Sequence, residues 1–317
     1  MARSTFGLEC LLDAPHEEQE TQARRPGFAR FAIERVTGTD ARKAVFVGRQ
    51  DGHPAELPLL RGAKGPERAH AFHRDLQRLA LHMGHDPVRV PPRVAAWPGK
   101  GLPVQRLTEG RPMCQALAGP ERDEMIGRAG GWLAHLVSTE RRRLSFGGRY
   151  WLRRRGAELA AKRAQPTDRR LADELSNRLE ALLTTVAGRP ITQARWSGDF
   201  RPRNLLLRDG AVYGLASGDP GRMQLVRDTA RFLVALRAGH PRAETGDIRF
   251  GFHGADLDAL LAPIPAIPAG ERALHLPFFI GVELAGAFAL CPPDLPETAA
   301  LCDAIGHFLG GIGPPTL

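Results

Sequence analysis

The chain has 317 residues, of which 43% are hydrophobic and 25% are charged. This composition can bury a core and excludes an intrinsically disordered chain. The formal net charge is +9, and because only four of the 44 basic residues are lysines, the other 40 are arginines. The length excludes a single small module and fits one large domain or two lobes, of which we expect two lobes.

The arginine excess predicts anionic partners such as nucleotides, phosphorylated substrates, nucleic acid or an acidic membrane surface, because the guanidinium is a planar, always charged donor to phosphate. GC-rich coding explains the same bias without any function. Neither a zinc site nor a disulfide framework is indicated by the wide spacing of Cys10, Cys114, Cys291 and Cys302. We therefore expect a reducing, cytoplasmic location. The apolar window over residues 276–291 is interrupted by Glu283, so it predicts a buried helix and no membrane span.

Residues 1–28 are polar and charged, and we expect them to be poorly ordered. Residues 29–107 have the pattern of a small β-rich lobe with one helix. Two β-like runs on either side of residues 38–40 predict a hairpin, and Pro58 within the next run predicts an edge strand or an irregular one. An amphipathic helix is predicted by the helical spacing of Phe72, Leu76, Leu79 and Met83. Two more strand-like segments, VRVPPRVAAW and residues 102–107, complete this lobe.

Residues 108–317 change to helical patterns and predict a larger, mainly α-helical lobe. Helices are expected near residues 125–136, 171–186, 226–237, 271–290 and 297–309. The basic stretch between the first two, residues 141–155, is interpreted as a solvated helix face, with contact to substrate or nucleic acid as the alternative. One β-like island interrupts the helices, where the Asp209-Gly210 turn predicts a hairpin of strands 204–208 and 211–215.

The loop before this hairpin, residues 197–204, places a carboxylate, a guanidinium and an amide within six positions: Asp199, Arg201 and Asn204. A carboxylate can accept the proton of an attacking hydroxyl. An arginine can neutralise a transferring phosphoryl group, and an amide oxygen can ligate Mg²⁺. The loop therefore has the groups that phosphoryl transfer needs.

The sequence SGDFRPRN resembles the HGDxxxxN catalytic loop of the aminoglycoside phosphotransferase and choline kinase group, and also the DxKxxN loop of protein kinases. LTEGRPM is similar to the hinge segment of that group, and RDTARFL, with Asp228, to the D-L-A motif that buttresses its catalytic loop. Ser197 stands where the group usually has histidine. The resemblance covers residues 29–317 and implies an α+β, bilobal protein-kinase-like fold.

The resemblance also implies transfer of the γ-phosphoryl group of ATP, with Mg²⁺, to a hydroxyl of a small-molecule acceptor. It implies Asp199 as the catalytic base, Arg201 in the place of the phosphate-contacting lysine, and Asn204 as a metal ligand. The group has a second metal-binding aspartate twelve residues before the D-L-A aspartate. Here that position is Ala216, which cannot coordinate Mg²⁺. Asp219, three residues on, is the alternative metal ligand or else a solvated turn residue.

The smaller lobe departs from the group at the strand lysine that holds the nucleotide phosphates and pairs with a helix glutamate. The equivalent strand, PAELPLLRG, offers Leu59 or Arg61, and Lys64 lies just beyond it. On the following helix the nearest acid is Asp75. The candidate nucleotide-binding residues are therefore Arg61, Lys64 and Asp75.

Three functions remain open from the sequence. The first is an ATP-dependent small-molecule kinase, which the set of Asp199, Arg201 and Asn204 favours. The second is a pseudokinase that senses nucleotide or binds a partner, which Ala216 and the missing strand lysine favour. The third is an RNA- or anion-binding protein that uses its arginines, although the presence of only two tyrosines and of no aromatic-basic run argues against nucleic acid as a partner.

Overall fold

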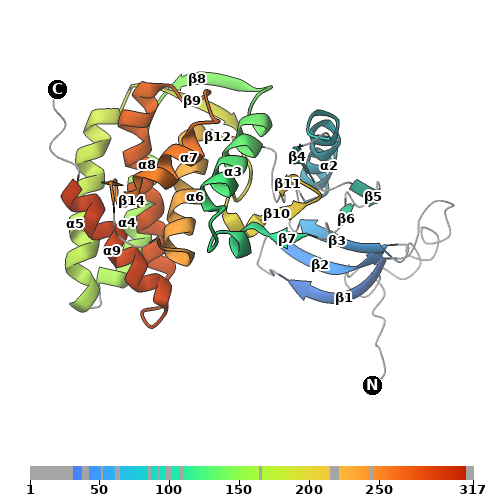
Figure 1. The fold of residues 1–317 in the computed structure, drawn as a ribbon, viewed down its shortest axis with the longest axis horizontal. Helices are drawn as coiled ribbons and strands as arrows, with labels where there is room; N and C mark the ends of the chain where they lie inside the picture. Colours follow the sequence, from blue (N-terminus) through green and yellow to red (C-terminus); the bar gives the residue numbers. More distant parts are fainter. Residues whose placement is uncertain are drawn as a thin grey trace. The chain divides into compact units, whose positions relative to one another are not determined.

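The computed structural model describes most of the chain, and every structural statement below concerns those residues. They are 31–37, 43–50, 53–60, 65–84, 87–90, 93–97, 102–106, 110–163, 166–214, 221–242 and 246–311. The predicted segment 1–28 lies outside them. The described residues form two compact units, one ending at Gly110 and one beginning at Arg111. The first is a small β-rich unit and the second a larger helical one, which confirms the predicted α+β class (Figure 1).

The first unit is an antiparallel sheet with the strand order β1-β2-β3-β6-β5 and one long helix, α2 (Gly65–His82). Its strands are β1 (Phe31–Thr37), β2 (Lys43–Gln50), β3 (His53–Leu60), β5 (Arg93–Trp97) and β6 (Leu102–Arg106), with the short β4 (Val88–Arg89) after the helix. The predicted hairpin is β1 and β2, which pair from Phe31 with Gln50 to Thr37 with Val45. The helix buries Leu76 and Leu79, with Met83 just beyond its end, as the periodicity predicts.

Pro58 predicted an edge strand or an irregular one, and β3 as a whole is not an edge strand, because it lies inside the sheet between β2 and β6. Pairing with β6 is recorded only at Ala55 and Glu56, whereas pairing with β2 continues to Leu60. Within the described residues Pro58 therefore stands opposite β2 alone. An internal strand accommodates proline there because its missing N–H removes no bond from a second ladder.

The second unit is built on seven helices in its described part: α3 (Arg122–Leu136), α4 (Arg149–Arg163), α5 (Pro166–Val186), α6 (Leu225–Gly239), α7 (Gly254–Leu261), α8 (Ala269–Leu290) and α9 (Pro296–Gly311). Helix α8 is central and packs against α4, α5, α6 and α9 (Figure 1). It is long and apolar enough to cross a bilayer, but 72% of its apolar window is buried inside the protein. This burial fits the predicted core helix.

Short strands connect these helices. The strands β8 (Arg141–Ser145), β9 (Pro190–Arg195) and β12 (Arg222–Gln224) form one antiparallel sheet in the order β12-β9-β8. A second group joins β7 (Arg111–Pro112), β10 (Leu205–Arg208) and β11 (Ala211–Gly214), and the strands β13 (Ile248–Arg249) and β14 (Phe252–His253) form a third pair. Single-turn 3-10 helices, η2 (Met113–Ala116) and η3 (Pro202–Asn204), precede α3 and β10.

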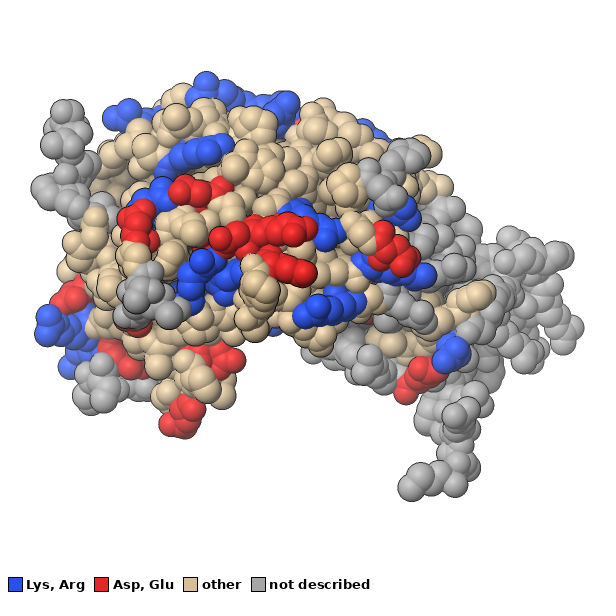
Figure 2. All heavy atoms as spheres, in the orientation of Figure 1, with Lys and Arg blue, Asp and Glu red and all other residues tan. Residues whose placement is uncertain are grey.

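The basic stretch 141–155 is not the continuous solvated helix face that we predicted. Its first part is the strand β8, in which all five residues are exposed, and its last part is the first half of α4. Figure 2 shows arginine and lysine side chains along the edge of the molecule where Figure 1 draws β8. Arg155, at the end of the stretch, is only 4% exposed, so it belongs to the interior.

Candidate functional site

The loop that carries the predicted site is held by a tight hairpin. Strands β10 and β11 pair from Leu205 with Gly214 to Arg208 with Ala211. The turn residues Asp209 and Gly210 both have positive φ angles, 49° and 76°. This left-handed pair is the conformation that a two-residue hairpin turn needs, and Asp-Gly tolerates it well. The hairpin therefore fixes the direction from which the chain enters and leaves η3.

Beneath the loop, three aromatic rings hold it to two helices. The Phe200 ring lies 5.9 Å from the Trp132 ring of α3, stacked at 11°, and 5.0 Å from the Phe232 ring of α6. All three side chains are nearly fully buried. Because Phe200 directly follows Asp199, this stack anchors the backbone of the loop while the carboxylate remains partly exposed, at 24% of its side-chain surface.

The three residues predicted to carry the chemistry lie together. The Asn204 side-chain amide donates to the Asp199 backbone carbonyl at 2.8 Å and to Asp199 Oδ2 at 3.0 Å. The Arg201 Nε atom is 2.8 Å from Asp199 Oδ1. The loop thus presents a carboxylate, a guanidinium and an amide at one place. Whether they act as base, phosphate contact and metal ligand stays a prediction.

Two further arginines approach the same carboxylate. Arg203 Nη2 is 3.5 Å from Asp199 Oδ2, and Arg231 Nη1, from α6, is 3.4 Å from Asp199 Oδ1. Burial lowers the pKa of Arg201, and although Asp199 opposes this, the neighbouring Arg231 and Arg203 add to the lowering. The carboxylate therefore stands among three guanidiniums.

Arg231 links the loop to a buried ion-pair network centred on Glu283 of α8. Glu283 pairs with Arg231 at 3.0 Å, with Arg227 at 2.9 Å and with Arg155 at 3.8 Å. Burial alone would raise the pKa of Glu283, but the three guanidiniums together hold it below its ordinary value. The Arg227 guanidinium also lies 4.7 Å from the Trp151 ring. The network thus fixes Arg231 beside Asp199.

The sequence interpretation missed this network. A charged residue inside an otherwise apolar window, Glu283, was the available signal, since a buried charge needs a partner. Its partners Arg155 and Arg227 are 128 and 56 residues away in the chain, so their pairing could not be read from local spacing.

Asp228 of α6 supports the start of the loop. The Ser197 backbone amide donates to Asp228 Oδ2 at 3.3 Å, which is the kind of buttress that the resemblance implies. The carboxylate is 2% exposed, and burial raises its pKa to about 6, against the lowering effect of Arg227 and of the Ser197 amide. Helix α6 therefore contributes both Asp228 and Arg231 to the loop.

Several predicted residues cannot be placed. Arg61, Lys64, Ala216 and Asp219 lie outside the described residues. Asp75 lies on α2 and is 8% exposed, so it is a buried residue of the first unit. The predicted nucleotide-binding and second metal-binding positions therefore stay predictions.

The described donor set does not by itself fit a Mg²⁺ site. Because Asn204 uses its amide nitrogen on Asp199, its Oδ1 remains available to a cation. Among the described residues no group of three histidine, cysteine or acidic side chains could hold a metal ion. Position 216 is alanine, which supplies no ligand. Asp219, the alternative metal ligand, lies outside the described residues, so its role stays a prediction.

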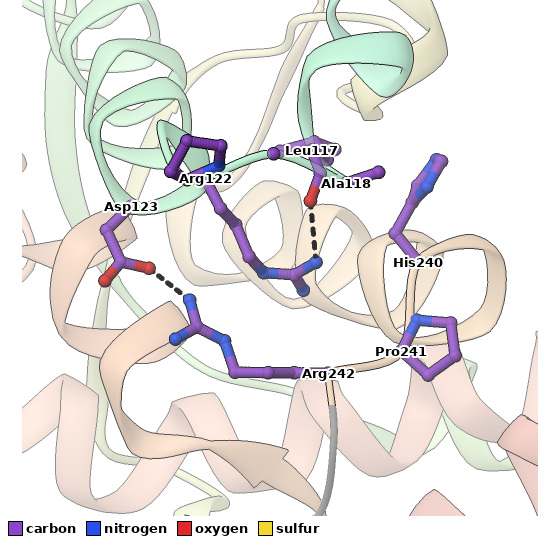
Figure 3. A pocket seen from close by; sticks show the side chains of 9 residues that line it. Leu117, Ala118, Arg122, Asp123, His240, Pro241 and Arg242 are labelled. Carbon is purple, nitrogen blue, oxygen red and sulfur yellow. Dashed lines mark hydrogen bonds and ion pairs between the residues drawn. The ribbon is translucent and has the colours of Figure 1, made fainter.

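A separate cavity of about 430 Å³ opens at the beginning of α3 and the end of α6 (Figure 3). It contains two arginines, but both have acidic partners. Arg122 donates to both Asp256 oxygens, at 3.0 and 2.8 Å, and Arg242 pairs with Asp123 and with Asp256. Burial, together with Arg122, lowers the pKa of His240 on its wall. With its arginines neutralised, this cavity is a weaker candidate for an anion site than the 197–204 loop.

Comparisons with known proteins give matches among solved structures. No protein-family model matches the chain, and no curated protein sequence matches it. An amicoumacin kinase in complex with AMP-PNP, Ca²⁺ and Ami is 14% identical, with a TM-score of 0.57, over 96% of this chain and 98% of that one. A microcompartment-associated aminopropanol kinase is 17% identical, with a TM-score of 0.58, over 93% and 98%.

The GDP complex of an aminoglycoside 2'-phosphotransferase is 14% identical, with a TM-score of 0.57, over 93% of this chain and 98% of that one. Identities this low establish a common architecture and leave substrate and activity open. The chain therefore has the α+β, kinase-like fold that is shared by aminoglycoside phosphotransferases and by choline and aminopropanol kinases.

Proposed function

We propose that this protein is an ATP-dependent phosphotransferase that phosphorylates a hydroxyl group of a small molecule. The observation that carries the proposal is the meeting of Asp199, Arg201 and Asn204 in one loop, on a fold shared with small-molecule kinases. One of the similar kinases is in complex with AMP-PNP and Ca²⁺, and another with GDP. Both complexes support a nucleotide as the phosphoryl donor here.

In the proposed reaction the acceptor oxygen attacks the γ-phosphorus, a new O–P bond forms, and the bond to the β,γ-bridging oxygen breaks to release ADP. The Asp199 carboxylate takes the proton of the acceptor hydroxyl. Arg201 faces the charge on the transferring phosphoryl oxygens, and Asn204 and Arg231 hold the carboxylate in place from two sides. In this proposal Arg61 or Lys64 contacts the nucleotide phosphates, and Asp75 takes the place of the helix acid that pairs with Arg61.

The first experiment measures phosphoryl transfer and ATP turnover with Asp199→Asn. The expected result is a loss of activity of about a hundredfold or more, since the variant keeps the shape and loses the base. Asp209→Asn is the matched control, because Asp209 lies in the same hairpin at 80% side-chain exposure and pairs only with its neighbour Arg208 among the described residues. Equal activity of the Asp199 variant and the parent chain would remove Asp199 from the mechanism.

A pseudokinase of the same fold is the second candidate, and Ala216 favours it, because a metal ligand is missing from the place where the resemblance expects one. Thermal unfolding with millimolar ATP, with and without Mg²⁺, tests nucleotide binding apart from turnover. At a hundred times its Kd, ATP stabilises the fold by about 2.7 kcal/mol. A stabilised protein without transfer activity indicates a nucleotide-sensing pseudokinase. An unchanged melting temperature contradicts the kinase and leaves only a pseudokinase that binds a partner.

The dependence on Mg²⁺ is tested separately with Ala216→Asp. If residue 216 faces the phosphates, the new carboxylate strengthens the Mg²⁺-dependent part of ATP stabilisation. The control is the same measurement in Ca²⁺-free buffer with a metal chelator, where parent and variant should respond alike. An unchanged Mg²⁺ effect would show that residue 216 does not take the expected position and would leave Asp219 as the carboxylate to test.

A further inference from the structure

Three guanidiniums surround Asp199, the carboxylate that is proposed to take the proton of the acceptor hydroxyl. Both oxygens of the carboxylate are contacted by guanidiniums: Oδ1 by Arg201 and Arg231, and Oδ2 by Arg203. One negative charge therefore stands against three positive ones at distances of 2.8 to 3.5 Å. Only Arg231 has a second carboxylate, Glu283, among its described partners.

The two loop arginines reach the surface. The Arg201 side chain is 35% exposed and the Arg203 side chain 65%, whereas Arg231 is 14% exposed. Asp199 is the one carboxylate with which Arg203 pairs among the residues that the structure describes, and the contact uses a single terminal nitrogen at 3.5 Å. A guanidinium has five N–H donors, so Arg203 keeps donors for a ligand. Arg203 directly precedes Asn204 in η3.

The crowding of cations determines which acceptors the loop can admit. Arg201 already has like-charged neighbours that lower its pKa, in addition to its burial. An acceptor with an ammonium group beside its hydroxyl would add a fourth cation to this cluster. An acceptor with a carboxylate or phosphate beside its hydroxyl would instead supply the negative charge that the cluster lacks, and a guanidinium binds either group in a bidentate way.

We propose that the acceptor is a hydroxyl compound with an anionic group close to the reacting hydroxyl, and that Arg203 binds this group. The inference rests on the proposed function. Arg201 remains the contact to the transferring phosphoryl group, because its Nε lies 2.8 Å from the carboxylate that takes the proton. Arg203 lies four residues after Asp199 and is more exposed than Arg201. It can therefore bind an anionic group of the acceptor at the end away from the transferring phosphoryl group.

Four three-carbon probes that differ in one terminal group test the inference: glycerate, glycerol 3-phosphate, glycerol and 3-amino-1,2-propanediol. Their binding is measured as thermal stabilisation of the full chain in saturating AMP-PNP, and their phosphorylation with radiolabelled ATP. The expected result is stabilisation by glycerate, by glycerol 3-phosphate or by both, and none by the amine. The first two probes distinguish a carboxylate from a phosphate as the bound group.

The variant Arg203→Ala should weaken binding of the anionic probe about tenfold, and Arg203→Lys should recover part of the loss because it keeps the charge. The matched control is Arg208→Ala, since Arg208 is an exposed arginine of the same hairpin that pairs with Asp209 at 3.0 Å. It should bind the probe as the parent chain does.

Equal or better binding of the amine, full binding by Arg203→Ala, or no effect of any probe overturns the inference. These results leave the proposed function standing as long as AMP-PNP itself stabilises the protein. If AMP-PNP gives no stabilisation, the proposed function fails first, so the two failures are distinguishable.

Discussion

At the scale of single residues, the buried Glu283 is linked to the candidate site through Arg231, which pairs with both Glu283 and Asp199. The carboxylate is 6% exposed and has three arginines around it, one of which also contacts Asp199. A buried ion pair adds little net stability, but removing one partner leaves uncompensated charges in the interior. The network therefore positions Arg231 beside Asp199, and the loss of one of its charges lowers the free energy of unfolding.

The variant Glu283→Gln tests this cost. We expect the free energy of unfolding to fall by about 3 kcal/mol, because Arg227 and Arg231 lose their shared carboxylate. Urea denaturation measures it. Glu174→Gln is the control, since Glu174 pairs with Arg170 on the surface of α5 and its loss should leave stability unchanged. Equal effects of the two substitutions would mean that the network contributes no more than a surface pair.

His275 provides a second prediction at this scale. Its side chain is 2% exposed, and neither ring nitrogen has a hydrogen-bond partner among the residues that the structure describes. Burial, with Arg189 and Arg143, lowers its pKa to about 4. The folded state keeps the ring neutral, while the unfolded chain takes up a proton below about pH 6.5. His275 should therefore cost stability progressively as the pH falls from about 6.5 towards 4, by up to about 3 kcal/mol.

Asp228 acts in the opposite direction over part of the same range. Its folded pKa of about 6 lies above the ordinary value of 3.8, so the folded state holds a proton that the unfolded state releases, and its contribution to stability is lost as the pH rises to about 6. The two effects are separated by urea denaturation of His275→Leu and the parent chain at pH 7 and pH 5. The variant should lose less stability at pH 5, and parallel behaviour would contradict the assignment.

At the scale of elements, the hairpin and α3 fit closely at one glycine. A Cβ atom placed on Gly214, the last residue of β11, would overlap the Trp132 indole of α3. That indole also stacks on Phe200, so the close approach of backbone and ring links the hairpin, the helix and the loop. A strand that meets a large ring at this position can hold only glycine.

We expect Gly214→Ala to destabilise the protein by about 2 kcal/mol, because either Trp132 or β11 must shift in a packed interior. Thermal or urea unfolding measures the change. Gly131→Ala is the control, because a Cβ on Gly131, in the same helix α3, would meet no atom of the described part of the chain within 4 Å. Alanine there should stabilise the helix by up to about 1 kcal/mol. Opposite signs for the two glycines are expected, and a neutral Gly214 variant would rule out the close fit.

Local patterns predicted most of the elements but not all. The long helices α3, α5, α6, α8 and α9 followed from their apolar periodicity, and the β10–β11 hairpin from its Asp-Gly turn. Helix α7 has only eight residues, which is too short for a periodic pattern. The strand β8 is fixed by its pairing with β9, from Arg141 with Ala194 to Ser145 with Pro190, and such distant pairing leaves no local signal.

At the scale of the whole molecule, the sequence predicted the fold class through one loop and its neighbourhood. Asp199, Arg201 and Asn204 could be found because they lie within six positions, and their meeting in the structure follows from η3 and the hairpin. Arg203 lies in the same loop but was not singled out. Arg231 could not be found, because its contact with Asp199 depends on the packing of α6.

The net charge of +9 gives a prediction for the molecule as a whole. Exposed arginines such as those of β8 should retain the protein on heparin at low salt, and a few hundred millimolar salt should release it, because nonspecific binding to a polyanion depends on counterion release. Retention at about 1 M salt would contradict this and would favour the RNA- or anion-binding function over the small-molecule acceptor.

The aromatic stack under the loop contains a tryptophan, Trp132, so the intrinsic fluorescence of the protein can report on the loop. Of the four tryptophans, Trp132 lies against Phe200, and Trp151 and Trp196 lie 4.7 and 6.0 Å from the Arg227 guanidinium that pairs with Glu283. Indole emission depends on the charges and rings around it, so a change in the loop or in the network will alter the intrinsic fluorescence. Nucleotide and acceptor titrations can therefore be followed in the unlabelled chain, and Trp132→Phe identifies the part of the signal that comes from the loop.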